Sequence, residues 1–218
     1  MESLKVLLVN GSPHKEGCVY TVLSEIAGTL KEEGIQSEIF WVGNQPMAGC
    51  IGCGSCIGKR SCFRKDTVND FTALIDKYDG FGEEKEKVKL WYDGFIFGTP
   101  VHYAGASGFM TSFMDRVFFI DEFNGEHFAG KPAAAIATCR RSGGTATLDQ
   151  LNKYMADCNM PIVPSQYWNI VHGNTPEEIR NDEEGLQTMC VLARNMAWLL
   201  KCIQVGRKAG ITFPERIP

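Results

Sequence analysis

Four cysteines stand close together in the sequence, at a spacing that suits metal binding. Cys50, Cys53 and Cys56 are separated from one another by two residues, and Cys62 follows after five more. Three thiolates at this spacing can wrap around one compact centre, with a fourth from nearby. Structural zinc sites usually combine two separated pairs of cysteines, which this segment lacks. The spacing therefore favours an iron–sulfur cluster, with zinc and metal-free redox thiols as the alternatives.

Positive charge is expected near the four clustered cysteines and also near a fifth cysteine, Cys18. Four basic residues lie within or just after the cluster segment, namely Lys59, Arg60, Arg64 and Lys65. They would partly offset the negative charge of four thiolates. Cys18 begins a predicted helix, whose N-terminal end favours the thiolate if the thiol is accessible.

The composition narrows the class of protein. The chain has 218 residues, of which 44% are apolar, and a formal net charge of −4. This supplies a large core and excludes disordered, collagen-like and small disulfide-stapled proteins. The sequence has no basic stripe, so we expect no nucleic acid partner. Its longest early apolar run, residues 6–9, is too short for a signal peptide or a membrane span. We therefore expect a cytoplasmic protein without a membrane partner.

Three further segments carry residues suited to ligand binding. The first, residues 10–21, joins a strand to a helix, and the free N–H groups of a helix N-terminus suit a phosphate. The second, residues 98–108, has an apolar-aromatic step framed by glycines that can lie flat against a planar ring. The third, residues 138–144, has adjacent arginines that can compensate an anion and paired glycines that allow close approach. Each segment alone could also be an ordinary surface turn.

Alternating strands and helices position these segments. We predict strands at residues 5–9, 35–42, 94–98, 131–138 and 161–168, and helices at residues 17–34, 67–78, 105–119, 144–159 and 177–205. This alternation predicts a parallel sheet covered on both faces, with ligands bound where the strands end. The charged run at 81–89 is expected to be a solvated connection. No linker divides the chain, so we expect residues 1–218 to form one domain, with a cysteine-rich loop inserted at about 47–64.

The order of these segments resembles the NAD(P)H-dependent FMN reductase family of flavodoxin-like proteins, and most of all its iron–sulfur flavoprotein branch. The resemblance rests on GSPHK at 11–15, GTPVHY at 98–103, the third segment and the cysteine cluster. It spans roughly residues 4–160. It implies an α/β fold, namely a flavodoxin-like three-layer sandwich with a five-stranded parallel sheet in the order 2-1-3-4-5.

The resemblance also implies which residues bind the cofactors. The FMN phosphate would contact Ser12, His14, Gly17, Cys18, Val19 and Thr21. The ribityl chain and the ring would contact Thr99, Pro100, Val101, His102, Tyr103 and Ala104, and the ring would be bordered by Arg140, Arg141, Gly143 and Gly144. A 4Fe-4S cluster would be held by Cys50, Cys53, Cys56 and Cys62. The family commonly has arginine in place of His14 and Asn-Thr in place of Cys18-Val19, so two side-chain contacts to the phosphate are lost or altered.

The expected function follows from this resemblance. It implies an FMN-dependent oxidoreductase that takes hydride from NAD(P)H and passes electrons to a quinone, a nitro or azo compound, free flavin or an iron–sulfur centre. The flavin performs the chemistry, so no catalytic side chain is expected. A flavodoxin- or ferredoxin-like electron-transfer protein without small-molecule turnover is the alternative, and a zinc-stabilised binding module without flavin is a third. The family commonly forms homodimers or homotetramers.

Overall fold

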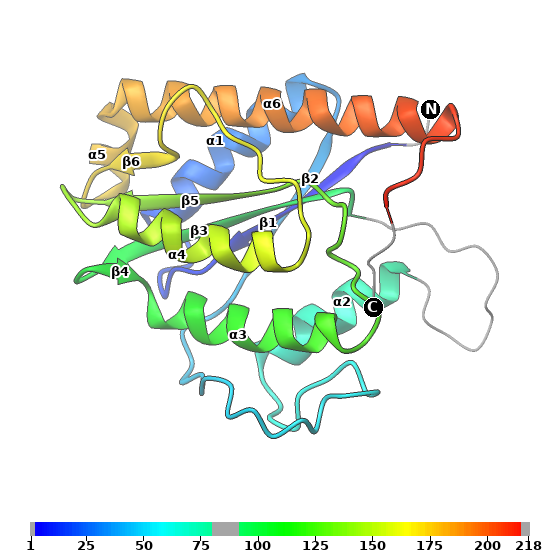
Figure 1. The fold of residues 1–218 in the computed structure, drawn as a ribbon. Coiled ribbons are helices and arrows are strands. Elements are labelled where there is room, and N and C mark those ends of the chain that lie inside the picture. The colour runs from blue at the N-terminus through cyan, green and yellow to red at the C-terminus, as the bar shows by residue number, and fades with distance from the viewer. Residues whose placement is uncertain (1–2, 80–91, 215–218) are drawn as a thin grey trace.

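In the part of the chain that the structure describes, five parallel strands form the centre and six helices cover the two faces of the sheet (Figure 1). The computed structural model describes residues 3–79 and 92–214. The strands are β1 (Lys5–Asn10), β2 (Gln36–Trp41), β3 (Gly94–His102), β4 (Gly105–Ala106), β5 (Ala133–Cys139) and β6 (Ile170–His172). The helices are α1 (Cys18–Glu32), α2 (Thr67–Asp79), α3 (Gly108–Glu122), α4 (Gly144–Asp157), α5 (Pro176–Asn181) and α6 (Glu183–Lys208).

The parallel strands lie in the order β2-β1-β3-β5-β6. The short β4 is antiparallel to β3 and forms a hairpin with it, through pairs Val101 with Ala106 and His102 with Gly105. Counting only the parallel strands, the order is the predicted 2-1-3-4-5, so the predicted sheet is confirmed. The predicted charged connection at 81–89 lies outside the described residues.

Alternate residues of β1 belong to two separate cores. Val6 and Leu8 pack with α1 and α6 on one face, whereas Leu7 and Val9 pack with α2, α3 and α4 on the other. All four side chains are fully buried. A strand that is apolar on both faces is what a parallel sheet between two helical layers requires. Figure 1 shows these layers, with α1 and α6 above the sheet and α3 and α4 below it.

Two of the elements predicted in the C-terminal half of the chain differ from those in the structure. The predicted strand at 161–168 is wrong, because only Ile162 forms an isolated bridge there and the strand itself is β6. Pro164 offers no N–H to a ladder, and the Ser165 hydroxyl hydrogen-bonds within the loop that follows. The predicted helix at 177–205 is divided at Asp182, whose side chain accepts from the Gly185 N–H and caps α6.

Gly98 brings α1 close to the sheet. A Cβ at this position would lie 2.9 Å from Cγ1 of Val19 and 3.1 Å from Cγ1 of Ile136. Any larger residue at the middle of β3 would therefore push α1 outward.

We expect Gly98→Ala to destabilise the protein by about 1–3 kcal/mol, because the added methyl group overpacks the contact between α1 and β3. The control is Gly28→Ala in α1, where no neighbouring atom lies within 4 Å of the new Cβ. That change should be neutral or stabilising by up to about 1 kcal/mol. Urea unfolding followed by circular dichroism measures both, and an unchanged midpoint for Gly98→Ala would contradict the packing described.

Candidate functional site

The three predicted loops meet at the edge of the sheet where β1, β3 and β5 end (Figure 1). The Gly11 N–H donates to the Gly98 carbonyl at 2.8 Å, which joins the first loop to β3. The second loop meets the third where Val101 Cγ1 lies 2.8 Å from the position that a Gly143 Cβ would take. Residues far apart in the sequence therefore form one continuous edge.

The first loop is held in shape by its own hydrogen bonds. Asn10 Oδ1 accepts from the Ser12 N–H, and Ser12 Oγ accepts from the His14 N–H. The Asn10 amide also donates to the Lys15 carbonyl, while the Trp41 indole donates to the Ser12 carbonyl at 2.8 Å. Ser12 is buried and His14 is exposed. Asn10 and Trp41 were not predicted, although asparagine directly after a strand is a typical turn-forming residue.

The residues that begin α1 contribute mainly backbone groups. Val19 is fully buried against Gly98, so only its N–H can face a ligand. The Thr21 hydroxyl donates to the Gly17 carbonyl within the first turn. Burial raises the pKa of the Cys18 thiol, and the carboxylates of α5 add to the effect. A Cys18 thiolate was expected only if the thiol is accessible, and its partial burial, which the sequence does not show, favours the neutral thiol instead.

Two helices begin without a side-chain cap, and both follow predicted ligand-binding loops. The N-cap residues of α1 and α4 are Gly17 and Gly143, and neither helix has an acidic residue in its first turn. The other helices are capped by the side chains of Asp66, Ser107, Thr175 and Asp182. The open N–H groups of α1 and α4 are therefore available to an anionic ligand.

The second loop is a hairpin whose base is buried and whose tip is exposed. Thr99 is fully buried, and its hydroxyl accepts from the Ser107 N–H at 3.2 Å. Pro100 and Val101 are half-buried, whereas three consecutive residues at the tip are exposed, namely His102, Tyr103 and Ala104. Tyr103 has a φ of +63°, an uncommon conformation for a residue with a side chain. The tip is thus shaped by the turn, and its side chains are open to solvent.

The third loop places two glycines against the sheet and two arginines outside it. Gly143 has a φ of +86°, and a Cβ on Gly144 would lie 2.6 Å from Cδ1 of Ile170. Glycine is therefore required at both positions. Arg140 and Arg141 are exposed, and neither forms an ion pair with another described residue.

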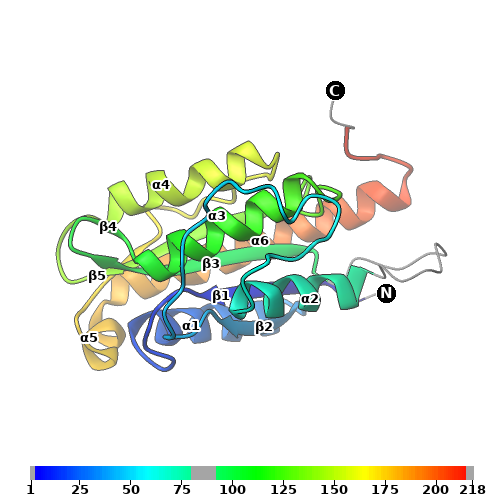
Figure 2. The ribbon, with the colours of Figure 1, turned by 90° about the horizontal axis from the view of Figure 1, so that it is seen from below.

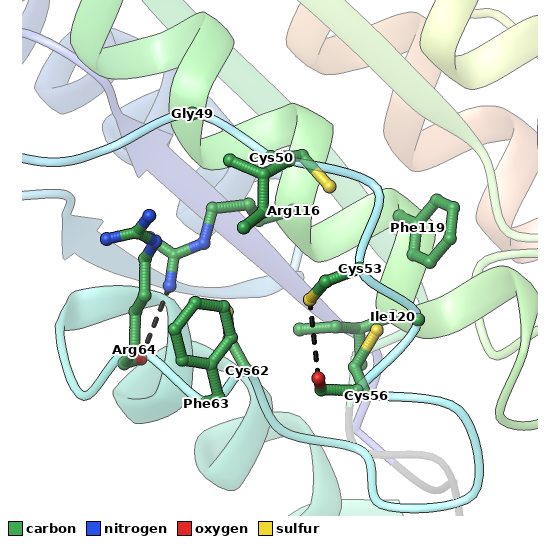
Figure 3. Close-up of a pocket in the computed structure, with 13 residues that line it drawn as sticks. Gly49, Cys50, Cys53, Cys56, Cys62, Phe63, Arg64, Arg116, Phe119 and Ile120 are labelled. Atoms are coloured by element: carbon green, nitrogen blue, oxygen red, sulfur yellow. Dashed lines mark hydrogen bonds between the residues drawn. The ribbon is translucent and has the colours of Figure 1, made fainter.

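All four predicted cysteines line one pocket, together with Arg116 of α3 (Figure 3). Cys50 and Cys53 are exposed, Cys62 is half-buried and Cys56 is buried. Within the described part of the chain, no three histidine, cysteine or carboxylate groups converge on a position for a single ion. The four thiols of one loop line a single pocket, and this arrangement fits a polynuclear cluster in which each iron takes one thiolate.

Two of the four thiols have shifted pKa values. Hydrogen bonding with Ser55 lowers the pKa of Cys53. Burial raises the pKa of Cys56, and the nearby thiols raise it further because their negative forms repel one another. Cys53 therefore loses its proton more readily than Cys56 does.

Amide side chains hold the backbone of the cysteine loop. Asn69 of α2 accepts from the Cys62 N–H and donates to the Cys62 carbonyl, while Asn124, just after α3, donates to the Cys56 carbonyl at 3.0 Å. Figure 2 shows the loop leaving β2, crossing α3 and returning to α2. These contacts were not predicted, since they join residues distant in the sequence.

The predicted compensation of charge is confirmed in part, because Arg64 lines the pocket and its charge lowers the pKa of Cys53. Lys59 and Lys65 are exposed. Arg60 turns away to the Asn124 carbonyl, and the Arg64 guanidinium lies over the Phe63 ring. The buried cation at the pocket is Arg116, which the sequence analysis missed. Its spacing from Phe113 and Ile120 places Arg116 on the apolar face of α3. This spacing is the feature of the sequence from which a buried arginine could have been predicted.

Comparison with known proteins supports this description. The family model described as NADPH-dependent FMN reductase matches residues 4–81 and 83–175. An iron-sulfur flavoprotein of Methanocaldococcus jannaschii is 27% identical over 207 residues, which cover 92% of this chain and 100% of that protein. An iron-sulfur flavoprotein of Methanosarcina thermophila is 24% identical over 209 residues, covering 94% and 99%.

Solved structures show the same fold at low sequence identity. RosB, solved with a bound riboflavin-phosphate intermediate, superposes with a TM-score of 0.69 at 13% identity, over 99% of this chain and 92% of that chain. No helix in the described ranges is both long and apolar enough to cross a membrane. A flavodoxin from the domain Archaea superposes with a TM-score of 0.56 at 12% identity, over 91% of this chain and 99% of that chain, which confirms the predicted flavodoxin-like fold. The residues that the family model matches include all three loops and the cysteine cluster. The chain belongs to the NADPH-dependent FMN reductase family.

Proposed function

We propose that this protein binds FMN, takes hydride from NAD(P)H and passes the electrons to an iron–sulfur group or a small acceptor such as a quinone, a nitro or azo compound or free flavin. The observation that carries the proposal is the pair of uncapped helices at one sheet edge. Both α1 and α4 begin at glycine, directly after loops that the family resemblance assigns to the flavin. A phosphorylated planar cofactor supplies the acceptors that these N–H groups lack.

Different residues at this edge would bind different parts of FMN. The N–H groups of Cys18 and Val19, with the preorganised Ser12, would hold the phosphate. The hairpin tip at 102–104 would border the ring, and Arg141 would stabilise negative charge near it. When bound, FMN supplies the group that accepts hydride and then passes the electrons to the acceptor. The protein orients the flavin and excludes other reactions.

The cysteine pocket fits a second redox group. Its four thiols come from one loop that amide side chains hold in place, and a buried arginine supplies positive charge. A 4Fe-4S cluster there would supply one-electron transfer when bound. The resemblance to iron-sulfur flavoproteins over most of the chain supports this assignment.

The phosphate site is tested by Gly17→Val. The first added carbon would lie 2.9 Å from Cβ of His14, so the loop must open and the free N–H groups must move. We expect FMN affinity to fall at least about tenfold, or about 1.4 kcal/mol. Gly28→Val in the same helix, at a position open to solvent, is the matched control and should keep the normal affinity. Flavin fluorescence titration measures both, and equal affinities would place the phosphate elsewhere.

Hydride transfer is tested under anaerobic conditions. NADPH or NADH should bleach the visible absorbance of the bound flavin, and an added quinone should restore it over repeated cycles. The sequence leaves a carrier protein as the alternative. If the flavin is reduced by a low-potential protein donor and by neither nucleotide, the carrier assignment replaces the enzyme.

The role of the cysteines is tested by anaerobic reconstitution with iron and sulfide. The wild-type chain should bind about four irons, whereas Cys56→Ala should bind fewer because one iron would lack its thiolate. Cys202→Ala, at an exposed cysteine outside the pocket, is the control and should match the wild type. Equal iron contents in the wild type and Cys56→Ala would leave only a simple flavin reductase.

A further inference from the structure

Arg116 is a charged side chain in an apolar position. It lies on α3 with a relative exposure of 2%, and Phe113 and Ile120 on the same face are also buried. A buried guanidinium costs stability unless its charge is paired and its donors are satisfied. Asp66 Oδ2 accepts from Nη1 at 2.6 Å, and the carbonyls of Ala48 and Arg64 accept at 3.3 Å each.

One N–H group of this guanidinium lacks a hydrogen-bond acceptor among the described residues. Arg116 Nε is buried and has no hydrogen-bond partner among the described residues. Such groups are rare in folded proteins, and an absent ligand is one ordinary reason for them. Arg116 lines the pocket that contains the four cysteines, and Figure 3 shows its side chain extending from α3 toward Arg64. The unused donor and the four thiols thus belong to the same site.

We propose that Arg116 is a positioning residue for an anionic cluster in this pocket, and that the Arg116–Asp66 pair tunes the reduction potential of that cluster. The inference rests on the iron–sulfur group of the proposed function. Reduction adds one electron, and hence one negative charge, to the site without forming or breaking a bond. A fixed positive charge nearby stabilises the reduced form and raises the potential, while Asp66 opposes this effect.

Arg64 also lines the pocket, but it is only half-buried and its guanidinium lies over the Phe63 ring. The other three basic residues of the loop are poorly placed for this task. Lys59 and Lys65 are exposed, so solvent and salt screen their charge. Arg60 is engaged with Asn124 and His127. Burial keeps Arg116 from this screening and by itself lowers the pKa of the guanidinium, but hydrogen bonding to Asp66 and Cys62 outweighs this effect and raises the pKa, so that the group stays charged.

A purely structural role is the competing explanation. Through the Ala48 and Arg64 carbonyls, Arg116 also holds both ends of the cysteine loop, and a variant could fail for that reason alone. The test must therefore measure a quantity that loop anchoring does not change when the cluster is retained. The midpoint potential of the cluster is such a quantity.

The experiment uses the full chain, reconstituted anaerobically, with iron and sulfide counted before each potentiometric titration with dithionite. Arg116→Gln should keep its iron and show a more negative midpoint potential than the wild type. Arg116→Lys, which restores the charge, should recover most of the difference. Asp66→Asn should shift the potential to more positive values, and adding Arg116→Gln to it should reverse that shift. Lys59→Gln removes one exposed charge from the same loop and should have almost no effect.

Each outcome decides between the explanations. If Arg116→Gln and the double variant bind full iron at the wild-type potential, Arg116 is only structural and the inference is wrong, while the proposed function stands. If Arg116 variants lose the cluster, Asp66→Asn decides, because it retains Arg116 and every cysteine. An unchanged or more negative potential in Asp66→Asn overturns the inference. A wild-type chain that binds no iron instead refutes the iron–sulfur part of the proposed function.

Discussion

The contact between α1 and β3 at Gly98 governs how the rest of the molecule is arranged. Because this position has no side chain, Val19 at the start of α1 packs directly over the strand, and the Gly98 carbonyl accepts the Gly11 N–H. The first turn of α1 is therefore drawn down to the carboxyl edge of the sheet. The hairpin after β3 and the start of α4 lie at the same edge. The close packing of α1 on β3 therefore brings the first loop next to the other two.

Local pattern predicted most of the buried strands and the proximity of the four cysteines, whereas the order of the strands in the sheet was predicted from the family resemblance. The apolar runs of β1, β3 and β5 predicted buried parallel strands, and short spacing brought four cysteines into one loop. The strand expected at 161–168 was wrong because apolar content there reflects exposed Tyr167 and Trp168 as much as the sheet. A proline inside a predicted strand was the signal against it.

Interactions between distant segments explain what the sequence could not predict. The cysteine loop is held by Asn69 of α2, Arg116 of α3 and Asn124 just after α3, all of which follow the loop in the chain. Likewise, the pKa of Cys18 is raised first by burial and then by the carboxylates of α5, which lies far along the sequence. Residue type and spacing identify groups capable of chemistry, whereas charge and burial at each group are set by neighbours that only the folded chain supplies.

The short length of β6 limits how the sheet of one molecule can pair with the strands of another. This strand forms one edge of the sheet, yet it contains only three residues, Ile170–His172. Pro164 and the hydrogen-bonded loop around Ser165 precede it, and the chain turns into α5 soon after it. A long open edge invites pairing with the strands of other molecules, whereas a short one offers few unpaired backbone groups. The same interruption that shortens β6 thus leaves this side of the sheet a poor template for aggregation.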